Sequence, residues 1–468
     1  MSQHEGLSLK SVSALGLRGF IVCELFCVGG FLAFLRLGSM PLAMVFLVGP
    51  FQLFAWLIAL KDVSYALALF AALLPAAGLE LLPAPYYHYV YFPAAIPLLF
   101  LVTRGFLANG PGIGRMPFDR HDAVPLALLG VSLVIATANA VAHGWTRADF
   151  WSQAALLVEA MAIFYFFAVA PVTPKEVRTI ILVFCLALAA TVIATRLLPL
   201  LGGESETLIG GITSKGGLNT LGAMLSCGAA LLIGVSLQTD RGSARVIILL
   251  CLGVVLSTLI LTKSRGAWMG FGAALLYALL RVRSGWLWTV VVLAVLVLLG
   301  VGSLRQIILS RAGQTSEGDP SFFGRLVLWS YAWKVIKTNW MYGVGFDNFR
   351  YVKHFYGYPG NVWWMVRFHA HNIFLEMLAD LGVVGFTGSC WLFARTFIRL
   401  DRVVRAKVPD RWALALGLGA ALVGYAAHGL VDFVAFHYGV LALLAVVLGL
   451  GINVSRLDPS PGLRGHTT

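Results

Sequence analysis

Apolar runs long enough to cross a lipid bilayer recur along nearly the whole chain, and this pattern constrains the fold more than any other feature. Of the 468 residues, 59% are hydrophobic and only 12% are charged, whereas roughly a quarter of the residues in a soluble protein are charged. So few charged side chains cannot cover a water-facing surface of this size. The sequence therefore predicts an all-α, polytopic membrane protein without a large soluble domain.

Fourteen runs are candidate spans, and because several are short or poorly separated we expect about 12–14 transmembrane helices. The division predicts three parts: an N-terminal transmembrane bundle (1–303), a long polar segment (304–371), and C-terminal transmembrane helices with a tail (372–468). The runs are Leu15–Leu35, Met40–Leu60, Val63–Leu82, Tyr89–Val102, Val124–His143, Ala154–Val172, Val177–Leu200, Leu218–Leu237, Ala244–Leu261, Ala267–Leu280, Trp286–Ser303, Asn372–Arg395, Trp412–Leu430 and Phe433–Val454.

Positive charge predicts the orientation, because loops rich in Lys and Arg stay on the cytoplasmic side of a membrane. Basic loops alternate here with loops that are poor in Lys and Arg. If the N-terminus is cytoplasmic, both termini lie inside and residues 304–371 lie outside. The basic positions that set this orientation are Arg104, Arg115, Arg120, Lys175, Arg178, Arg241, Arg245, Arg281, Arg283, Arg395, Arg399, Arg402, Arg405, Lys407 and Arg411.

The outside segment breaks this rule, because it carries eight basic residues against three acidic ones. Two shorter outside loops also carry cations, at Lys215 and at Lys263 and Arg265. Basic loops that hold topology explain most of the net charge of +13, but not cations on the disfavoured side. An anionic ligand is the simplest explanation for them.

Two histidines stand where the outside segment meets an apolar helix, in the stretch Arg367-Phe368-His369-Ala370-His371-Asn372. Histidine is the side chain that exchanges a proton near neutral pH, so either ring could act as a general base on a hydroxyl group. The alternative is an interfacial histidine with a satisfied ring. A metal site is not expected, because the outside segment lacks the histidine and carboxylate spacing of a zinc site.

Two arginines are candidates for binding phosphate, since the guanidinium fork can make two parallel bonds to phosphate oxygens. Arg265 follows Ser264 at the start of an apolar run, and the alternative is an arginine that snorkels to lipid headgroups. Arg325 lies in the first turn of a helix predicted from Phe323 to about Thr338, and the alternative is an amphipathic helix on the membrane surface. The glycine-rich stretch Tyr342–Phe349 predicts a tight turn rather than a phosphate loop.

Other ionisable residues in apolar surroundings allow two interpretations. His428 and Asp432 lie near the last outside turn and either support the site or mark the end of a span. Glu80 and Glu159 lie within apolar runs, where a proton-coupled transporter would use carboxylates. A transporter of lipid-linked sugars is therefore a competing hypothesis.

The order of these motifs resembles the O-antigen ligase family, which shares a C-terminal signature with Wzy-type O-antigen polymerases and pilin O-oligosaccharyltransferases. The resemblance covers roughly Leu261–Tyr438. The matching pieces are Ser264-Arg265-Gly266, Gly324-Arg325 with Trp329, Gly343-Val344-Gly345-Phe346, His369-Ala370-His371-Asn372, Leu381-Gly382-Val383-Val384-Gly385 and His428-Gly429-Leu430-Val431-Asp432.

This resemblance implies a GT-C-type glycosyltransferase of the bacterial inner membrane that needs no metal or other cofactor and acts in lipopolysaccharide biosynthesis. It implies a polysaccharide donor on undecaprenyl pyrophosphate, a lipid A-core sugar hydroxyl as acceptor, and a site on the periplasmic side within residues 304–371 and the adjoining spans. No nucleic acid is implied. Arg265 and Arg325 take the role of binding the donor pyrophosphate, with Lys215 and Asn219 as lesser candidates. His371 or His369 takes the catalytic role, and Asn372, Arg367, His428 and Asp432 support the site.

Overall fold

The computed structural model describes residues 63–78, 119–147, 150–170, 172–194, 217–239, 242–282, 320–358, 368–434 and 438–456. The chain divides into two compact units, and the first of these (Met1–Phe70 and Leu82–Ile113) is described only at the start of one helix. All the other described elements belong to the second unit, Ala71–Leu81 and Gly114–Thr468.

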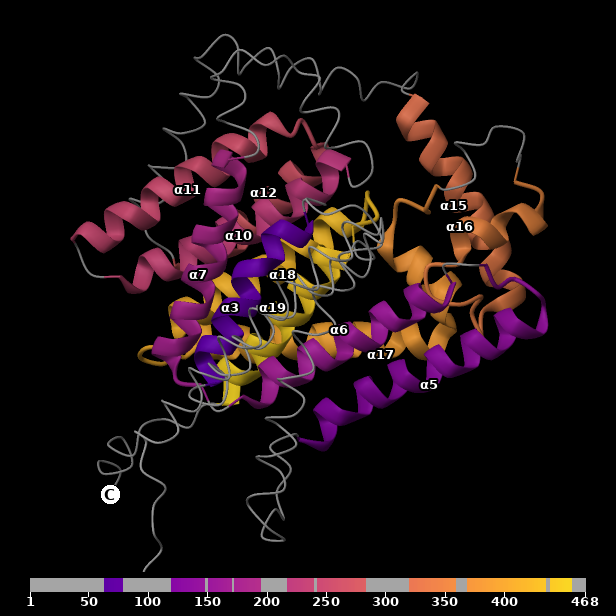
Figure 1. Cartoon of the computed structure of the whole chain (residues 1–468), viewed down its shortest axis with the longest axis horizontal. Helices are drawn as coiled ribbons and strands as arrows, with labels where there is room; N and C mark the ends of the chain where they lie inside the picture. The colour runs from indigo at the N-terminus through magenta and orange to yellow at the C-terminus, as the bar shows by residue number, and fades with distance from the viewer. Residues whose placement is uncertain are drawn as a thin grey trace, which may run out of the picture. The chain divides into compact units, whose positions relative to one another are not determined.

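The described residues are helical, with no strand among them, which confirms the all-α polytopic fold class (Figure 1). Seven of these helices are long and apolar enough to cross a membrane. The elements are α3 (Val63–Gly78), α5 (Arg120–Ala142), α6 (Phe150–Val169), α7 (Pro174–Val192), α10 (Gly217–Gln238), α11 (Ser243–Leu261), α12 (Arg265–Val282), α15 (Pro320–Asn339), α16 (Phe349–Val352), η3 (Lys353–Tyr356), α17 (Ile373–Arg405), α18 (Trp412–Gly429) and α19 (Tyr438–Arg456).

Ten of the fourteen predicted runs coincide with a described helix, and α5, α6, α10, α11, α17, α18 and α19 supply the seven candidate spans. The helix predicted from Phe323 to about Thr338 is α15, and the predicted turn at Tyr342–Phe349 joins it to α16. The runs Leu15–Leu35, Met40–Leu60, Tyr89–Val102 and Trp286–Ser303 lie outside the described residues.

The predicted end of one span at Arg395 was wrong, because α17 continues to Arg405. The basic segment expected to form a loop is helical as far as Arg405, where carboxylates pair with its arginines. Asp122 is fully buried and receives bonds from Arg395 and Arg399 at 2.6 and 3.1 Å, and from Arg456 at the end of α19. One buried carboxylate thus holds the ends of three helices together.

Small residues let the helices around the site approach closely, as is common between membrane helices. Added Cβ atoms at Gly234 and Gly270 would lie 2.6 and 2.7 Å from backbone oxygens of α18. Helix α18 therefore packs directly against both α10 and α12. Because α18 runs antiparallel to these two, its C-terminal end lies beside the N-terminal ends of α10 and α12.

Helix α17 is broken at Gly382, where φ is 64° and ψ is −175°. The turn after α15 fits into this break. Gly345 and Val344 donate backbone bonds of 3.0 Å to the carbonyls of Asp380 and Ala379. An added Cβ at Gly382 would lie 2.5 Å from the Met341 carbonyl oxygen, so only glycine permits this docking. The turn between α15 and α16 is thereby fixed to α17, one of the candidate membrane spans.

Candidate functional site

The two histidines lie on a short segment, 368–372, that leads directly into α17. Asn372 caps the helix, since its side-chain oxygen accepts bonds from the backbone N–H groups of Phe374 and Leu375 at 3.0 and 3.1 Å. Its amide nitrogen also donates to the Leu430 carbonyl at 3.0 Å. Asn372 therefore joins the histidine segment to the end of α18.

His371 is held by Asp432, which lies just beyond α18. The His371 Nδ1 atom is 2.9 Å from Asp432 Oδ1. Burial would raise the pKa of the Asp432 carboxyl, but the hydrogen bond from His371 holds this pKa below its usual range. An ionised carboxylate only accepts hydrogen bonds, so Nδ1 carries the proton. The Nε2 atom of His371 is then a proton acceptor, and no described residue bonds to it.

His428 links this pair to the start of α12. Its Nε2 atom lies 3.9 Å from Asp432 Oδ2, and its side chain is 2% exposed. An added Cβ at Gly266 would lie 2.7 Å from the His428 ring. Only a glycine at this position allows α12 to begin against the imidazole. The residue before it is Arg265, so the structure brings Arg265 to the same end of the helix bundle as His371.

Hydrogen bonds of Ser264 and Trp268 shape the start of α12, where Arg265 lies. Ser264 is the N-cap, and its hydroxyl accepts a bond from the Ala267 N–H at 3.3 Å. Trp268 donates its ring N–H to the Leu259 carbonyl at 2.9 Å and so closes the turn from α11. Arg265 is the first residue of α12, where the helix dipole adds to its positive charge. This combination favours an anion at the helix start.

Asn219 lies at the same end of the bundle. It is in the first turn of α10, three residues before Gly222. An added Cβ at Gly222 would lie 2.5 Å from the Ala267 side chain, so α10 and α12 are in contact there. A contact between Asn219 and the donor stays a prediction.

His369 has a different environment. Its Nδ1 atom lies 2.6 Å from Glu376 Oε1, and its ring stacks on Phe433 with the ring centroids 4.1 Å apart. Burial lowers the pKa of His369 to about 3. A base this weak is poorly suited to accept a proton near neutral pH. The geometry therefore favours His371 as the base and His369 as a residue that positions the segment.

Two buried carboxylates on the first turns of α17, Glu376 and Asp380, accept hydrogen bonds from the histidine segment and from the turn before α16. Glu376 also accepts a bond from the Ala370 N–H at 2.7 Å. One turn later, Asp380 accepts bonds from the N–H groups of Asp347 and Phe349, both at 2.8 Å. Both side chains are fully buried. The histidine segment and the turn before α16 are thus held by one face of one helix.

Lys353 completes this arrangement from the other side. Its fully buried ammonium group donates to the carbonyls of Arg350 and Phe368, both at 2.6 Å. Burial lowers the pKa of Lys353 to about 7. Arg350 in turn pairs with Asp347 at 2.6 Å. These bonds tie the start of the histidine segment to α16.

The structure brings together three possible metal ligands that no sequence spacing predicts. Asp347, His369 and Glu376 each offer one ligand atom, and these atoms lie within 4.8 Å of one another. The sequence did not reveal this group because its members are separated along the chain and meet only after folding. Arg350 and the Ala370 N–H already bond to the two carboxylates, which favours a hydrogen-bonded network over a metal centre.

The structure does not connect the other predicted site residues, Arg325, Lys215 and Arg367, to His371 or Arg265. Arg325 is in the second turn of α15, seven residues before Ala332, where this helix joins the buried cluster beside the histidine segment. Seven residues are about 10 Å of helix, and no interaction connects Arg325 to His371 or Arg265 among the described residues. Lys215 and Arg367 lie outside the described residues.

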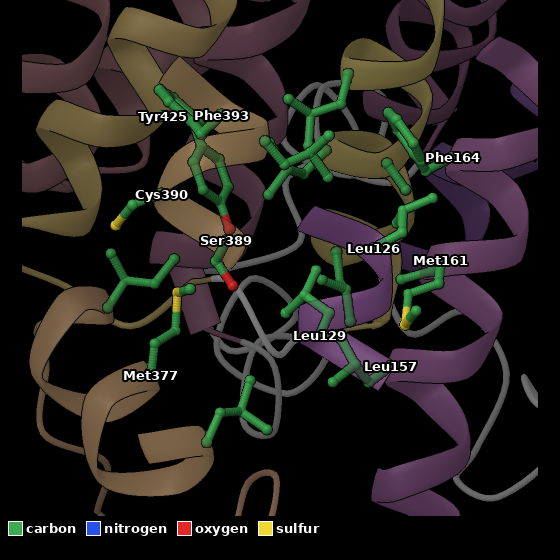
Figure 2. A pocket seen from close by; sticks show the side chains of 18 of the residues that line it. Leu126, Leu129, Leu157, Met161, Phe164, Met377, Ser389, Cys390, Phe393 and Tyr425 are labelled. Atoms are coloured by element: carbon green, nitrogen blue, oxygen red, sulfur yellow. The ribbon is translucent and has the colours of Figure 1, made fainter. Parts of the chain in front are cut away.

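An apolar cavity of about 130 Å³ lies beside the site, between α5, α6, α17, α18 and α19 (Figure 2). Its lining includes Phe346, next to Asp347, and Ile373, next to Asn372. Figure 2 shows leucine, methionine and phenylalanine side chains around it, with Ser389, Cys390 and Tyr425 as its polar members. A cavity with this lining suits hydrocarbon rather than a charged or sugar group.

Comparison with known families supports the interpretation of this region. Residues 246–389 match the family model described as O-Antigen ligase. The predicted family resemblance is confirmed over that segment, which runs from α11 into α17. The family covers O-antigen ligases and related polymerases. The match includes Arg265, Arg325 and both histidines of the segment, but it ends before His428 and Asp432. No curated protein matches the chain.

Proposed function

We propose that this protein is an O-antigen ligase: a metal-independent, inverting glycosyltransferase of the bacterial inner membrane. In this proposal it moves a polysaccharide from undecaprenyl pyrophosphate to a sugar hydroxyl of lipid A-core on the periplasmic side. Support comes from the family match over residues 246–389, the helical bundle with seven candidate spans, and the chemistry of the site.

One observation carries the proposal. The His371–Asp432 pair and the helix start bearing Arg265 are joined through the buried ring of His428. A base for an alcohol and a cation for a departing phosphate are the two groups that this transfer needs. Sequence segments more than 100 residues apart are folded together to provide them.

In the proposed reaction, the acceptor hydroxyl oxygen attacks the anomeric carbon of the donor sugar. Its proton passes to Nε2 of His371, and Asp432 stabilises the resulting imidazolium through Nδ1. The bond between the anomeric carbon and the pyrophosphate oxygen breaks, and its electron pair stays on the pyrophosphate. Arg265 and the N-terminal dipole of α12 balance the growing negative charge. Attack from the face opposite the leaving group inverts the carbon.

The other contacts expected with the substrates stay predictions. Arg325, Asn219 and Lys215 would extend the donor site, and Arg367 would support it. The apolar cavity would accept part of a hydrocarbon chain from a lipid-linked substrate. Placement of the termini in the cytoplasm, and of the site in the periplasm, rests on the distribution of positive charge.

The test is reconstitution of the full chain in vesicles with undecaprenyl-pyrophosphate polysaccharide and lipid A-core, with EDTA present. Transfer to lipid A-core supports ligase activity, whereas lengthening of the lipid-linked polysaccharide in the absence of acceptor supports a Wzy-type polymerase. Transfer to pilin alone would indicate an O-oligosaccharyltransferase. Movement of the donor across the bilayer without any transfer would favour the transporter hypothesis and would direct attention to Glu159.

Two variants at Arg265 separate the effect of its positive charge from the effect of its planar guanidinium group. Arg265→Gln removes the cation, and we expect it to reduce transfer by about 100-fold or more, as loss of a transition-state donor does. Arg265→Lys keeps the charge but not the planar fork, so we expect partial activity. Full activity of Arg265→Gln in protein that still inserts would contradict the proposed role.

A further inference from the structure

A second cationic site lies at the ends of α12 and α17 that are far from the histidines. A pocket of about 360 Å³ is lined there by Leu280, Arg281, Val282, Val404, Arg405 and Lys407. Helix α12 has 18 residues, with Arg265 first and Arg281 in its last turn. Its length is about 27 Å, which is close to the thickness of the hydrocarbon core of a bilayer. The pocket is therefore separate from the candidate active site.

Three basic side chains line the pocket, and the neighbouring carboxylate of Asp401 can balance only part of their charge. Asp401 Oδ1 accepts from Arg281 Nε at 2.5 Å, and Oδ2 accepts from Arg405 Nε at 2.7 Å. The Tyr277 hydroxyl also donates to Asp401 at 3.0 Å. The ammonium group of Lys407 makes no ion pair with a described residue. Three cations thus line the pocket, and Asp401 pairs with only two of them.

The geometry of the two arginines leaves donors available. Each reaches Asp401 through Nε, so its terminal nitrogens are directed away from that bond. The side chains of Arg281 and Arg405 are 29% and 66% exposed. Arginines that serve only membrane topology need no fixed orientation. Here Asp401 and the ring of Tyr277, 5.3 Å from the Arg281 guanidinium carbon, hold the forks in place.

The remaining lining of the pocket is aliphatic. Val282 and Val404 belong to it, and Leu280 is 55% exposed. A wall of hydrocarbon beside fixed guanidinium groups matches a molecule with a phosphate at one end and acyl chains beyond it. Basic pockets between membrane helices bind phospholipid headgroups in this way.

We propose that this pocket binds the phosphate headgroup of an anionic membrane lipid, such as phosphatidylglycerol, at the end of the bundle opposite His371. Arg281 and Arg405 contact the phosphate oxygens through their terminal nitrogens, Lys407 adds charge, and the acyl chains lie along Leu280. The bound lipid joins the ends of α12 and α17. The proposal does not depend on the transferase activity.

The chain offers a matched control for the test. Arg402 lies on the same helix as Arg405, has the same charge and is exposed, but it does not line the pocket. Arg405→Gln and Arg402→Gln therefore remove equal charge from neighbouring positions. Lys407→Gln is a second pocket variant that leaves the bonds to Asp401 intact.

The experiment is titration of the full-length protein in phosphatidylcholine nanodiscs with tail-labelled phosphatidylglycerol, read as energy transfer from the protein's tryptophans. One phosphate contact is worth about 1 kcal/mol, or about fivefold in Kd. We expect about this loss of affinity for Arg405→Gln and for Lys407→Gln, and less than about twofold for Arg402→Gln. Circular dichroism checks that each variant is folded.

Three results would overturn the proposal. The first is equal loss in all three variants, which would show attraction by net charge alone. The second is full competition by inorganic phosphate at the concentration of the lipid, which would mean that the pocket recognises free phosphate rather than a lipid. The third is unchanged affinity in folded Arg405→Gln and Lys407→Gln proteins.

Discussion

Substituting asparagine for each histidine in turn separates the two roles that the structure gives them. The asparagine side-chain nitrogen occupies nearly the position of Nδ1 of histidine, so each variant retains a donor to its carboxylate. His371→Asn keeps a bond to Asp432, and His369→Asn keeps a bond to Glu376. Each variant loses Nε2. The pair therefore tests which Nε2 atom accepts a proton.

The expected difference is large. Loss of a general base slows a reaction by about 100- to 10,000-fold, so His371→Asn should reduce the turnover number by that factor. His369→Asn loses a stacked ring contact with Phe433, worth about 1 kcal/mol. That cost falls on the stability of the loop, and we expect transfer to fall by less than about tenfold.

The assay is transfer of polysaccharide to lipid A-core by purified protein in vesicles, with single-turnover rates measured at saturating donor. Thermal unfolding in detergent shows whether each variant is folded. An inactive, folded His369→Asn protein, or a His371→Asn protein with normal turnover, would refute the assignment of His371 as the base.

Three further perturbations test the supporting structure. Asp432→Asn removes a charge-assisted bond worth about 1.5–3 kcal/mol, so turnover should fall about 10- to 150-fold; a normal single-turnover rate would show that Asp432 does not assist His371. The Lys353 pKa is lowered from 10.5 to about 7, so between these two values the unfolded chain binds more protons than the folded one, and the free energy of unfolding should rise with pH. In Lys353→Met, the thermal midpoint should therefore rise less between about pH 7 and 9 than it does in the parent protein. An equal rise in both proteins would contradict this account. Gly382→Ala places a Cβ 2.5 Å from the Met341 carbonyl oxygen at a residue whose φ is 64°, and we expect it to destabilise the protein by about 3 kcal/mol or more. The measurement is the thermal midpoint. The control is Gly253→Ala, because an added Cβ there meets nothing within 4 Å.

Hydropathy was sufficient to predict the fold class and most helix positions, because a bilayer requires long apolar helices whatever their packing. It failed at the end of α17, where Asp119 and Asp122 pair with Arg395 and Arg399 and allow charged residues to stay helical. Those pairs join residues more than 270 positions apart. No local pattern contains that information.

The site was predicted unevenly for the same reason. Arg265, His371 and Asp432 stood out because polar residues at the ends of apolar runs are rare. Glu376 and Asp380 lie in the apolar run Asn372–Arg395, and the sequence did not predict a role for them. Their spacing of four was the available signal, since it places two carboxylates on one face of an apolar helix. The spacing of Glu376 and Asp380 does not predict their hydrogen-bond partners, because these partners lie on loops.

These two carboxylates explain why the base is carried by a loop and yet is fixed in position. Glu376 holds the histidine segment, Asp380 holds the turn before α16, and both are anchored on the first turns of a membrane-spanning helix. His371 has a φ of 48°, a backbone conformation that persists only where the surroundings impose it. The bonds at Ala370 and Asn372, on either side, impose it here. The orientation of the imidazole toward Asp432 is thus set by α17 and the end of α18 together, so a mutation that loosens Glu376 should lower turnover while leaving donor affinity nearly unchanged.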